Sequence, residues 1–235
     1  MDPFMPGKNF NTSAMVRDAL PETIKLDDSR LINIIKYPHD IQASWSEVRE
    51  TVPQILSNKR RVFMPDCEDP DAELRIDILV QLGMRRSEDC IVFETVAWRD
   101  GYVQLDVDDK TLPPGDVEHG GIWEGLPEKL ATCFSISKLQ RNRWIKRFRQ
   151  VSTCSSRTLA LIVCLQDIPI RVSQDANSFI CEFQFYSALA ELYKRHLPAR
   201  VIFVHTPPGT AEKDIQDCAV IVEALIKTLV EQSGL

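Results

Sequence analysis

Short apolar segments recur along the chain, and polar segments with helical spacing separate them. The two clearest, residues 76–82 and 201–204, are apolar along almost their whole length, which is typical of strands buried on both faces. Such strands occur in mostly parallel sheets that helices cover on both sides. The pattern therefore predicts an α/β fold, a three-layer α/β/α arrangement around a mostly parallel, mixed sheet.

The other segments fit the same alternation. We expect a polar, loop-rich stretch over residues 101–126, and residues 159–165 are compatible with either a strand or a helix. Thr12 or Ser13 is a candidate cap for the first helix. The remaining expected strands are 31–35, 89–97 and 168–173, and the expected helices are 11–20, 44–57, 137–150, 175–195 and 211–231.

Length and charge narrow the function classes. A chain of 235 residues suits one domain spanning residues 1–235, and it is long enough to bury a substantial core. The net charge of −6 disfavours nucleic acid as a partner, because a polyanion is repelled by a negative average charge. The basic residues around Trp144 are interpreted as a solvated helix face. Whether the chain forms a homo-oligomer stays open.

The cysteine pattern and the first residues indicate which cell compartment and which metal sites to expect. The seven cysteines are an odd number and include no CxxC pair, so neither a disulfide framework nor a zinc site is expected. No segment approaches the ~20 apolar residues of a membrane span, and the first residues lack the features of a secretory signal. We expect a cytosolic protein with no membrane association and no metal or other cofactor.

One cysteine has a position that favours reactivity. Cys181 lies near the start of the helix expected over residues 175–195, directly after a strand. A helix N-terminus carries partial positive charge and unpaired N–H groups, both of which favour a thiolate. The alternative is an inert cysteine packed among the aromatic residues of the same helix, which is the commoner case for a lone cysteine.

A histidine and a glutamate could complete a catalytic group. His205 follows the apolar strand 201–204, where a general base for a cysteine could lie; the alternative is a surface histidine in a turn. Glu94 lies in the apolar segment 91–97, and burying a carboxylate there is costly unless a partner such as an imidazole compensates. A water-exposed edge strand would explain Glu94 equally well.

Taken together, these segments resemble the pyroglutamyl-peptidase I family of cysteine peptidases, and in particular its fungal members. Residues 173–181 (SQDANSFIC) are similar to the family's active-cysteine segment, S-x-D/T-A-G-x-F/Y-L/V-C, and residues 201–207 (VIFVHTP) to its histidine strand. Residues 83–84 and 93–97 resemble its glycine turn and E-x-x-A segment, and residues 2–4 and 11–13 resemble G-x-P-F and N-x-S. The blocks occur in the family's order and span nearly the whole chain.

The resemblance implies a phosphorylase/hydrolase-like α/β/α domain that removes N-terminal pyroglutamate from peptides. Cys181 would be the nucleophile, His205 the general base and acid, and Glu94 the residue that orients the imidazole. The substrate partners would be peptides that begin with pyroglutamate, and the reaction would need no cofactor. By position, the resemblance places four residues around the lactam ring: Phe4, Asn11, Phe179 and Ile180.

The chain also departs from the family pattern. The family begins with a hydrophobic strand directly before x-P-F, whereas this sequence starts at Met1 and reaches Phe4 without one, so the first strand is expected to be missing. The family glycine after Ala176 is Asn177, which is tolerated if the backbone there has positive φ. These departures leave an alternative function: a catalytically impaired relative that acts as a binding or interaction module.

Overall fold

The computed structural model describes residues 10–85, 89–112, 121–135 and 169–235. A four-stranded sheet forms its centre, with strand order β3-β8-β4-β7. β8 runs parallel to β3 and antiparallel to β4, and β4 runs parallel to β7, so the sheet is mixed. The strands are β3 (Leu79–Met84), β8 (Val201–Thr206), β4 (Ile91–Glu94) and β7 (Ile170–Ser173).

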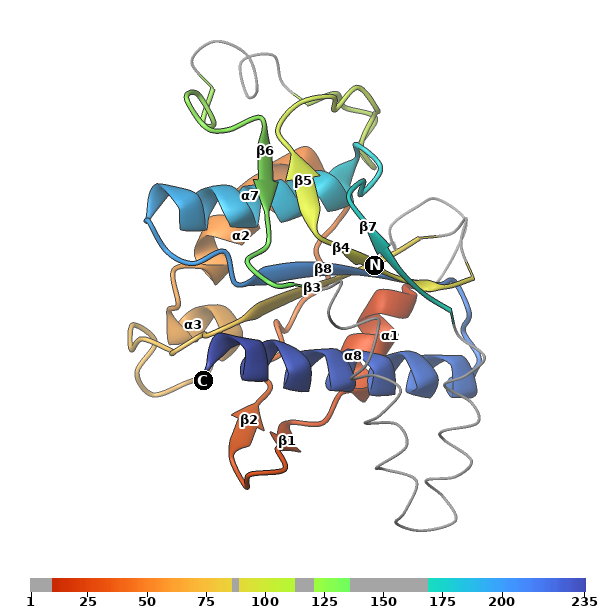
Figure 1. Cartoon of the computed structure of the whole chain (residues 1–235). Coiled ribbons are helices and arrows are strands. Elements are labelled where there is room, and N and C mark those ends of the chain that lie inside the picture. Colours follow the sequence, from red (N-terminus) through yellow and green to blue (C-terminus); the bar gives the residue numbers. More distant parts are fainter. Residues whose placement is uncertain (1–9, 86–88, 113–120, 136–168) are drawn as a thin grey trace.

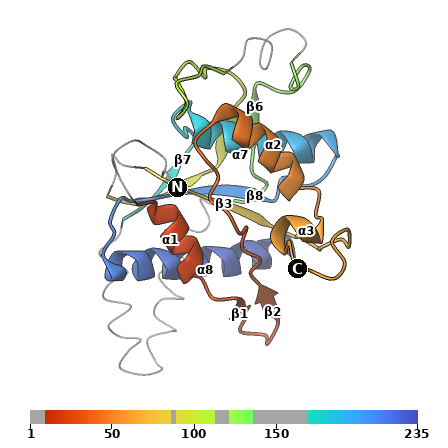
Figure 2. The same ribbon diagram turned by 180° about the vertical axis from the view of Figure 1, so that it is seen from behind.

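Helices cover both faces of this sheet, which confirms the predicted three-layer α/β/α fold. In Figure 1, α2 and α7 lie above the sheet, and α1 and α8 lie below it. Figure 2 shows from behind that α1 packs against α8. The helices are α1 (Thr12–Ala19), α2 (Trp45–Ile55), α7 (Ile180–Lys194) and α8 (Glu212–Ser233), with the short α3 (Arg60–Phe63) beside them.

The central strand β8 shows why the sequence forms this core. All six of its residues are buried, and most of them are β-branched or aromatic, the side chains that fit a pleated surface packed on both faces. Its side chains point alternately to the two faces of the sheet. Ile202 and Val204 pack toward α8 and α1. Val201 and Phe203 pack toward α7 and α2. β8 therefore fixes the positions of both helical layers.

Two small antiparallel pairs lie outside the main sheet. The predicted strand 31–35 is shorter than expected and pairs as β2 (Leu31–Asn33) with β1 (Thr23–Lys25), which the sequence analysis did not predict. The predicted strand 89–97 is two strands, β4 and β5 (Val96–Trp98), and β5 pairs with β6 (Lys129–Ala131). The chain changes sheet at Thr95, whose N–H donates to Ser173 O of β7.

Three further predicted boundaries differ from the structure, for local reasons. The strand expected over residues 76–82 is β3, and it begins at Leu79 because β8 offers no residue before Val201 to pair with. The helix expected over 175–195 begins at Ile180, after a turn with left-handed backbone. β8 continues to Thr206, so His205 lies inside the strand. The predicted helix 137–150 and the segment 159–165 lie outside the described residues.

Among the described strands, β3 is an edge strand: β8 pairs with one side of it, and no described strand pairs with the other. No helix in the described part of the chain is long and apolar enough to cross a membrane.

Candidate active site

Cys181 is the second residue of α7, which begins after Phe179 as its N-cap. The first turn of an α-helix has N–H groups without an intrahelical acceptor and carries partial positive charge. Cys181 lies within this first turn. The residue is buried, being 9% exposed, and it is in the apolar core between α7 and α2.

The sheet brings His205 and Glu94 together from two neighbouring strands. In the antiparallel pairing of β4 with β8, Glu94 is opposite Phe203, and His205 is its diagonal neighbour on the same face. His205 Nδ1 lies 2.9 Å from Glu94 Oε1, and both side chains are almost fully buried. Because an ionised carboxylate only accepts hydrogen bonds, Nδ1 carries the proton, and Nε2 remains for a second partner.

That second partner is Cys181. Burial alone would lower the pKa of His205, but the charge of Cys181 and a side-chain hydrogen bond to it, together with the Glu94 carboxylate, raise this pKa to about 9. The imidazolium is thus stabilised between a sulfur atom and a carboxylate. Both Cys181 and Glu94 thus act on the imidazole of His205.

Gly83 makes room for this arrangement. It is opposite His205 in the β3–β8 pairing, and a Cβ at this position would lie 2.7 Å from Phe203 Cζ and 3.2 Å from Cys181 Sγ. Backbone atoms of β3 can therefore approach the sulfur closely only because residue 83 has no side chain. The sequence analysis placed Gly83 in a turn; it lies within β3 and acts through this close approach.

The turn before Cys181 has the backbone that the family glycine would favour. Asn177 and Ser178 have φ values of +81° and +43°. Asparagine is one of the residues that adopt this region most readily, and Asp175 Oδ1 accepts the Asn177 N–H at 2.8 Å. The replacement of glycine by Asn177 is therefore compatible with an ordered turn.

Glu182 stabilises the same turn, and the sequence analysis missed it. It is fully buried, accepts the Ser178 N–H at 2.7 Å with one carboxylate oxygen, and accepts the Trp98 N–H at 3.2 Å with the other. Burial raises its pKa, which the two backbone N–H donors oppose. The available signal was a carboxylate in an otherwise apolar helical segment, which requires buried partners.

Arg85 is a second residue that the sequence analysis did not identify. It follows β3, and its Nη1 lies 3.4 Å from Glu94 Oε1. The same nitrogen donates to Asp175 O at 3.5 Å, in the turn that precedes α7. Arg85 therefore connects the buried carboxylate to the turn before Cys181. Glu94 Oε2 is buried and has no hydrogen-bond partner among the described residues.

A cavity of about 670 Å³ opens beside Cys181. Of the residues that the resemblance places around the lactam ring, Asn11 and Ile180 line it. Asn11 is also the N-cap of α1, a role that the sequence analysis gave to Thr12 or Ser13: its Oδ1 accepts the Ser13 N–H at 3.2 Å. Phe179 does not line the cavity; its ring packs edge-on against Trp45. Phe4 lies outside the described residues.

The arrangement can perform nucleophilic chemistry at a carbonyl. An imidazole that is hydrogen-bonded to a carboxylate lies beside a thiol, and the thiol borders a cavity; such a set of groups is suited to nucleophilic catalysis. Among the described residues, no group of three or more histidine, cysteine or acidic side chains is placed to hold a metal ion.

Solved structures with a similar fold include pyrrolidone carboxyl peptidases. A structure of this enzyme from the hyperthermophile Pyrococcus furiosus superposes with a TM-score of 0.62 at 17% sequence identity, covering 99% of this chain and 96% of the other. A single-site mutant of the same enzyme gives a TM-score of 0.61 at 17% identity, over 97% and 96% of the two chains. No protein-family model and no curated protein sequence matches the chain. The chain thus has the fold of the family that its motifs resemble.

Proposed function

We propose that the protein is a cysteine exopeptidase that removes N-terminal pyroglutamate from peptides. The observation that carries the proposal is the pairing of His205 Nδ1 with Glu94 Oε1 at 2.9 Å beside Cys181, at the positions that the family motifs assign to nucleophile, base and orienting acid. The shared fold of the pyrrolidone carboxyl peptidases supports it. We treat residues 1–235 as one peptidase domain that acts in the cytosol.

In the proposed reaction the Cys181 thiol gives its proton to Nε2 of His205, and the sulfur attacks the carbonyl that joins pyroglutamate to the next residue. The C–N bond breaks as the His205 imidazolium gives its proton to the leaving amine, and a thioester to Cys181 remains. Water then attacks this thioester, His205 takes the proton from the water, and free pyroglutamate and the thiol are released. Glu94 holds Nδ1 protonated throughout, so that Nε2 faces the reaction.

The negative oxygen of each tetrahedral intermediate needs hydrogen-bond donors. N–H groups of the first turn of α7, which begins one residue before Cys181, would supply them. The cavity next to the sulfur offers a mostly apolar surface with Asn11 and Ile180, which suits a small uncharged lactam. A free α-amino group would place an uncompensated charge there, which favours blocked N-termini.

Hydrolysis of pyroglutamyl-aminomethylcoumarin by the purified protein tests the proposal, with Cys181→Ala as the control. We expect release of coumarin by the wild type and a rate at background level for the variant. Equal rates for the two proteins would remove the claim.

The second candidate is an impaired relative that binds peptides without cleaving them, and Asn177 in place of glycine is the observation that favours it. Alkylation by iodoacetamide at pH 6 separates the two. Fast, selective modification of Cys181 indicates an activated thiolate, and slow labelling equal to that of the other cysteines indicates an inert thiol.

A further inference from the structure

Glu182 directly follows the nucleophile in the first turn of α7, and its side chain is fully buried. An ionised carboxylate loses its contacts with water on burial, which is costly unless hydrogen bonds replace them. Both oxygens have such bonds: Oε2 accepts the Ser178 N–H at 2.7 Å, and Oε1 accepts the Trp98 N–H at 3.2 Å. The carboxylate therefore bridges two backbone segments, the turn before Cys181 and β5.

The bridged turn has a backbone that needs support. Asn177 and Ser178 are consecutive residues with positive φ, and neither is glycine. Residues in this conformation persist where the surrounding structure holds them, and they cluster at active sites. Asp175 Oδ1 accepts the Asn177 N–H at 2.8 Å, and Glu182 accepts the next N–H, that of Ser178. Glu182 thus supplies the acceptor for the second of the two left-handed residues.

Trp98 contacts both ends of the same turn. Its backbone N–H reaches Ser178 through the carboxylate of Glu182, and its indole Nε1–H donates to Gln174 O at 3.3 Å. Its ring is also in contact with β6, because Lys129 Nζ lies 5.3 Å from the ring centroid. One residue of β5 therefore holds the start of the turn directly and the end of the turn through a carboxylate, and both contacts set where α7 begins.

This arrangement leaves N–H groups of the first turn of α7 free for the reaction. Phe179, the N-cap of α7, makes no side-chain cap hydrogen bond, and both oxygens of Glu182 accept N–H groups outside the helix. In the described part of the chain, no side chain accepts the N–H of Ile180 or Cys181. First-turn N–H groups of this kind are what the negative oxygen of the proposed intermediate requires.

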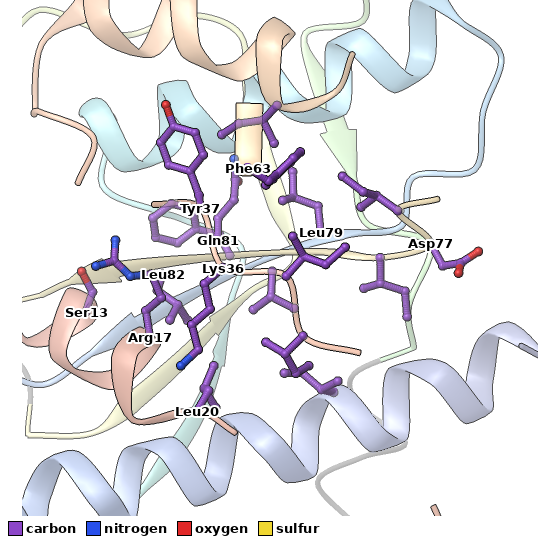
Figure 3. Close-up of a pocket in the computed structure, with 18 of the residues that line it drawn as sticks. Ser13, Arg17, Leu20, Lys36, Tyr37, Phe63, Asp77, Leu79, Gln81 and Leu82 are labelled. Atoms are coloured by element: carbon purple, nitrogen blue, oxygen red, sulfur yellow. The ribbon is translucent and has the colours of Figure 1, made fainter. Parts of the chain in front are cut away.

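We propose that Glu182 is a positioning residue for the peptidase reaction, an inference that rests on the proposed function. Its carboxylate holds the turn before Cys181 against β5 and so fixes the first-turn N–H groups relative to the sulfur. Figure 3 shows the cavity that borders Cys181, with Leu79 and Gln81 of β3 beside it, and neither Glu182 nor Trp98 lines this cavity. Glu182 therefore acts through the nucleophile and not by contact with the substrate.

The bridge requires the charged form of Glu182. A carboxylate accepts at both oxygens, whereas a carboxylic acid carries a proton on one of them, which leaves one good acceptor for two N–H donors. Burial raises the pKa of Glu182, the N–H groups of Ser178 and Trp98 lower it, and the negative charge of Asp175 raises it. Tyr102, after β5, also interacts electrostatically with Glu182. Because the net shift is upward, the bridge opens at a higher pH than that at which an exposed glutamate is protonated.

Glu182→Gln tests the positioning role, because it keeps the shape of the side chain but has one acceptor for two N–H donors. We expect kcat for pyroglutamyl-aminomethylcoumarin to fall roughly 10²-fold and KM to change less than about threefold, since misplaced catalytic groups slow the chemistry more than they weaken binding. Glu191→Gln, later in the same helix, is the matched control and should change neither. An unchanged kcat in Glu182→Gln, or a change in KM alone, would overturn the inference and leave the proposed function intact.

The pH dependence separates the charge of Glu182 from its size. The ratio of wild-type kcat to Glu182→Gln kcat should be roughly 10² at pH 8 and should fall toward 1 in acid, where the wild-type carboxyl group is protonated and resembles the amide. Cys181 and His205 titrate in both proteins, so their effect on this ratio is small. A ratio that is constant with pH would show that Glu182 acts through its shape alone and would overturn the assignment.

Trp98→Phe provides a second test at a residue that is 42% exposed. It removes the indole N–H that donates to Gln174 O and keeps an aromatic ring. We expect kcat to fall roughly fivefold, the effect of one typical hydrogen bond. In the double variant with Glu182→Gln, the loss should be smaller than the product of the two single losses, because both residues hold the same turn. Losses that multiply would show that the two residues act independently and would overturn the bridge.

Amide NMR of the wild type makes the test independent of turnover and of the folding of any variant. The amide signals of Ser178 and Trp98 should shift together along one titration curve as Glu182 is protonated, since both N–H groups donate to its carboxylate. Amide shifts that follow no common titration would overturn the bridge. If the wild type does not hydrolyse the coumarin substrate, the proposed function fails irrespective of this result.

Discussion

The two neighbouring strands β8 and β3 have opposite characters. β8 is paired on both sides and every one of its residues is buried, while β3 is paired on one side among the described residues and is only partly buried. β8 holds His205 in a fixed position beside Glu94, and β3 presents an unpaired edge to the cavity. The comparison shows that a strand paired on both sides holds two buried polar side chains in contact, while the strand beside it keeps one edge unpaired among the described residues.

The largest effect on activity is expected for Glu94, the hydrogen-bond partner of His205 on the doubly paired strand β8. Glu94→Gln keeps the shape of the side chain but removes the charge that orients and stabilises the His205 imidazolium, so kcat should fall roughly 10³-fold. The pKa of His205 should fall from about 9, because Glu94 is one of the groups that raise it. Steady-state kinetics and NMR titration of His205 measure the two effects. Glu191→Gln, in the last turn of α7 and far along the helix from Cys181, is the matched control and should leave both unchanged.

Amide hydrogen exchange measures the difference between the strands directly. The amides of Gln81 and Gly83 bond to β8 and should exchange slowly, whereas those of Val80 and Leu82 face the cavity and should exchange ~10²-fold faster. Equal protection of all four amides would mean that the β3 edge is already covered, and the comparison would fail.

The charge on His205 should make stability depend on pH. Its pKa is about 9 in the folded protein and near 6.5 when unfolded, so the folded state binds the proton more tightly. This stabilisation is complete below about pH 6.5 and is lost as the pH rises through about 9. We expect Tm to fall roughly 5 °C more between pH 6 and pH 10 in the wild type than in His205→Gln. Parallel melting curves for the two proteins over this range would contradict the assignment of the proton to His205.

The smallest effect is expected for a substitution of Gly83, the residue of β3 that is opposite His205 of β8. Gly83→Ala introduces a Cβ at 2.7 Å from Phe203 Cζ, which should lower the free energy of unfolding by roughly 1–3 kcal/mol and displace Cys181. Phe203→Leu in the same protein should relieve the clash, so that denaturant unfolding of the double variant shows less loss than the sum of the single variants. Additive losses would show that the contact with Phe203 is not the cause.

The sequence predicted the layers of the fold because hydrophobic periodicity is a local property. The apolar run of β8 and the amphipathic pattern of α8 can each be read without knowledge of their neighbours. The predicted ends of strands and helices were wrong where a neighbouring segment sets the boundary. β3 begins only where β8 offers a partner, and α7 begins only after the left-handed turn at Asn177 and Ser178. Strand and helix ends depend on such contacts.

The residues of the candidate site also differ in whether local sequence is enough to identify them. Cys181, His205 and Glu94 could be chosen as candidates from the sequence because each lies in a segment that resembles a family motif. Glu182 and Arg85 could not, because their importance depends on partners distant in sequence: Glu182 on Trp98 and Arg85 on Glu94.

By itself, the sequence determined the alternation of strands and helices and the residue types available for thiol chemistry. Tertiary structure alone decided that His205 and Glu94 are diagonal neighbours 2.9 Å apart and that Gly83 leaves room for the sulfur of Cys181. It also decided that the outer edge of β3 borders a cavity. The physical reason is that register, strand order and cavities arise from the pairing of distant segments, which the composition of any one segment does not specify.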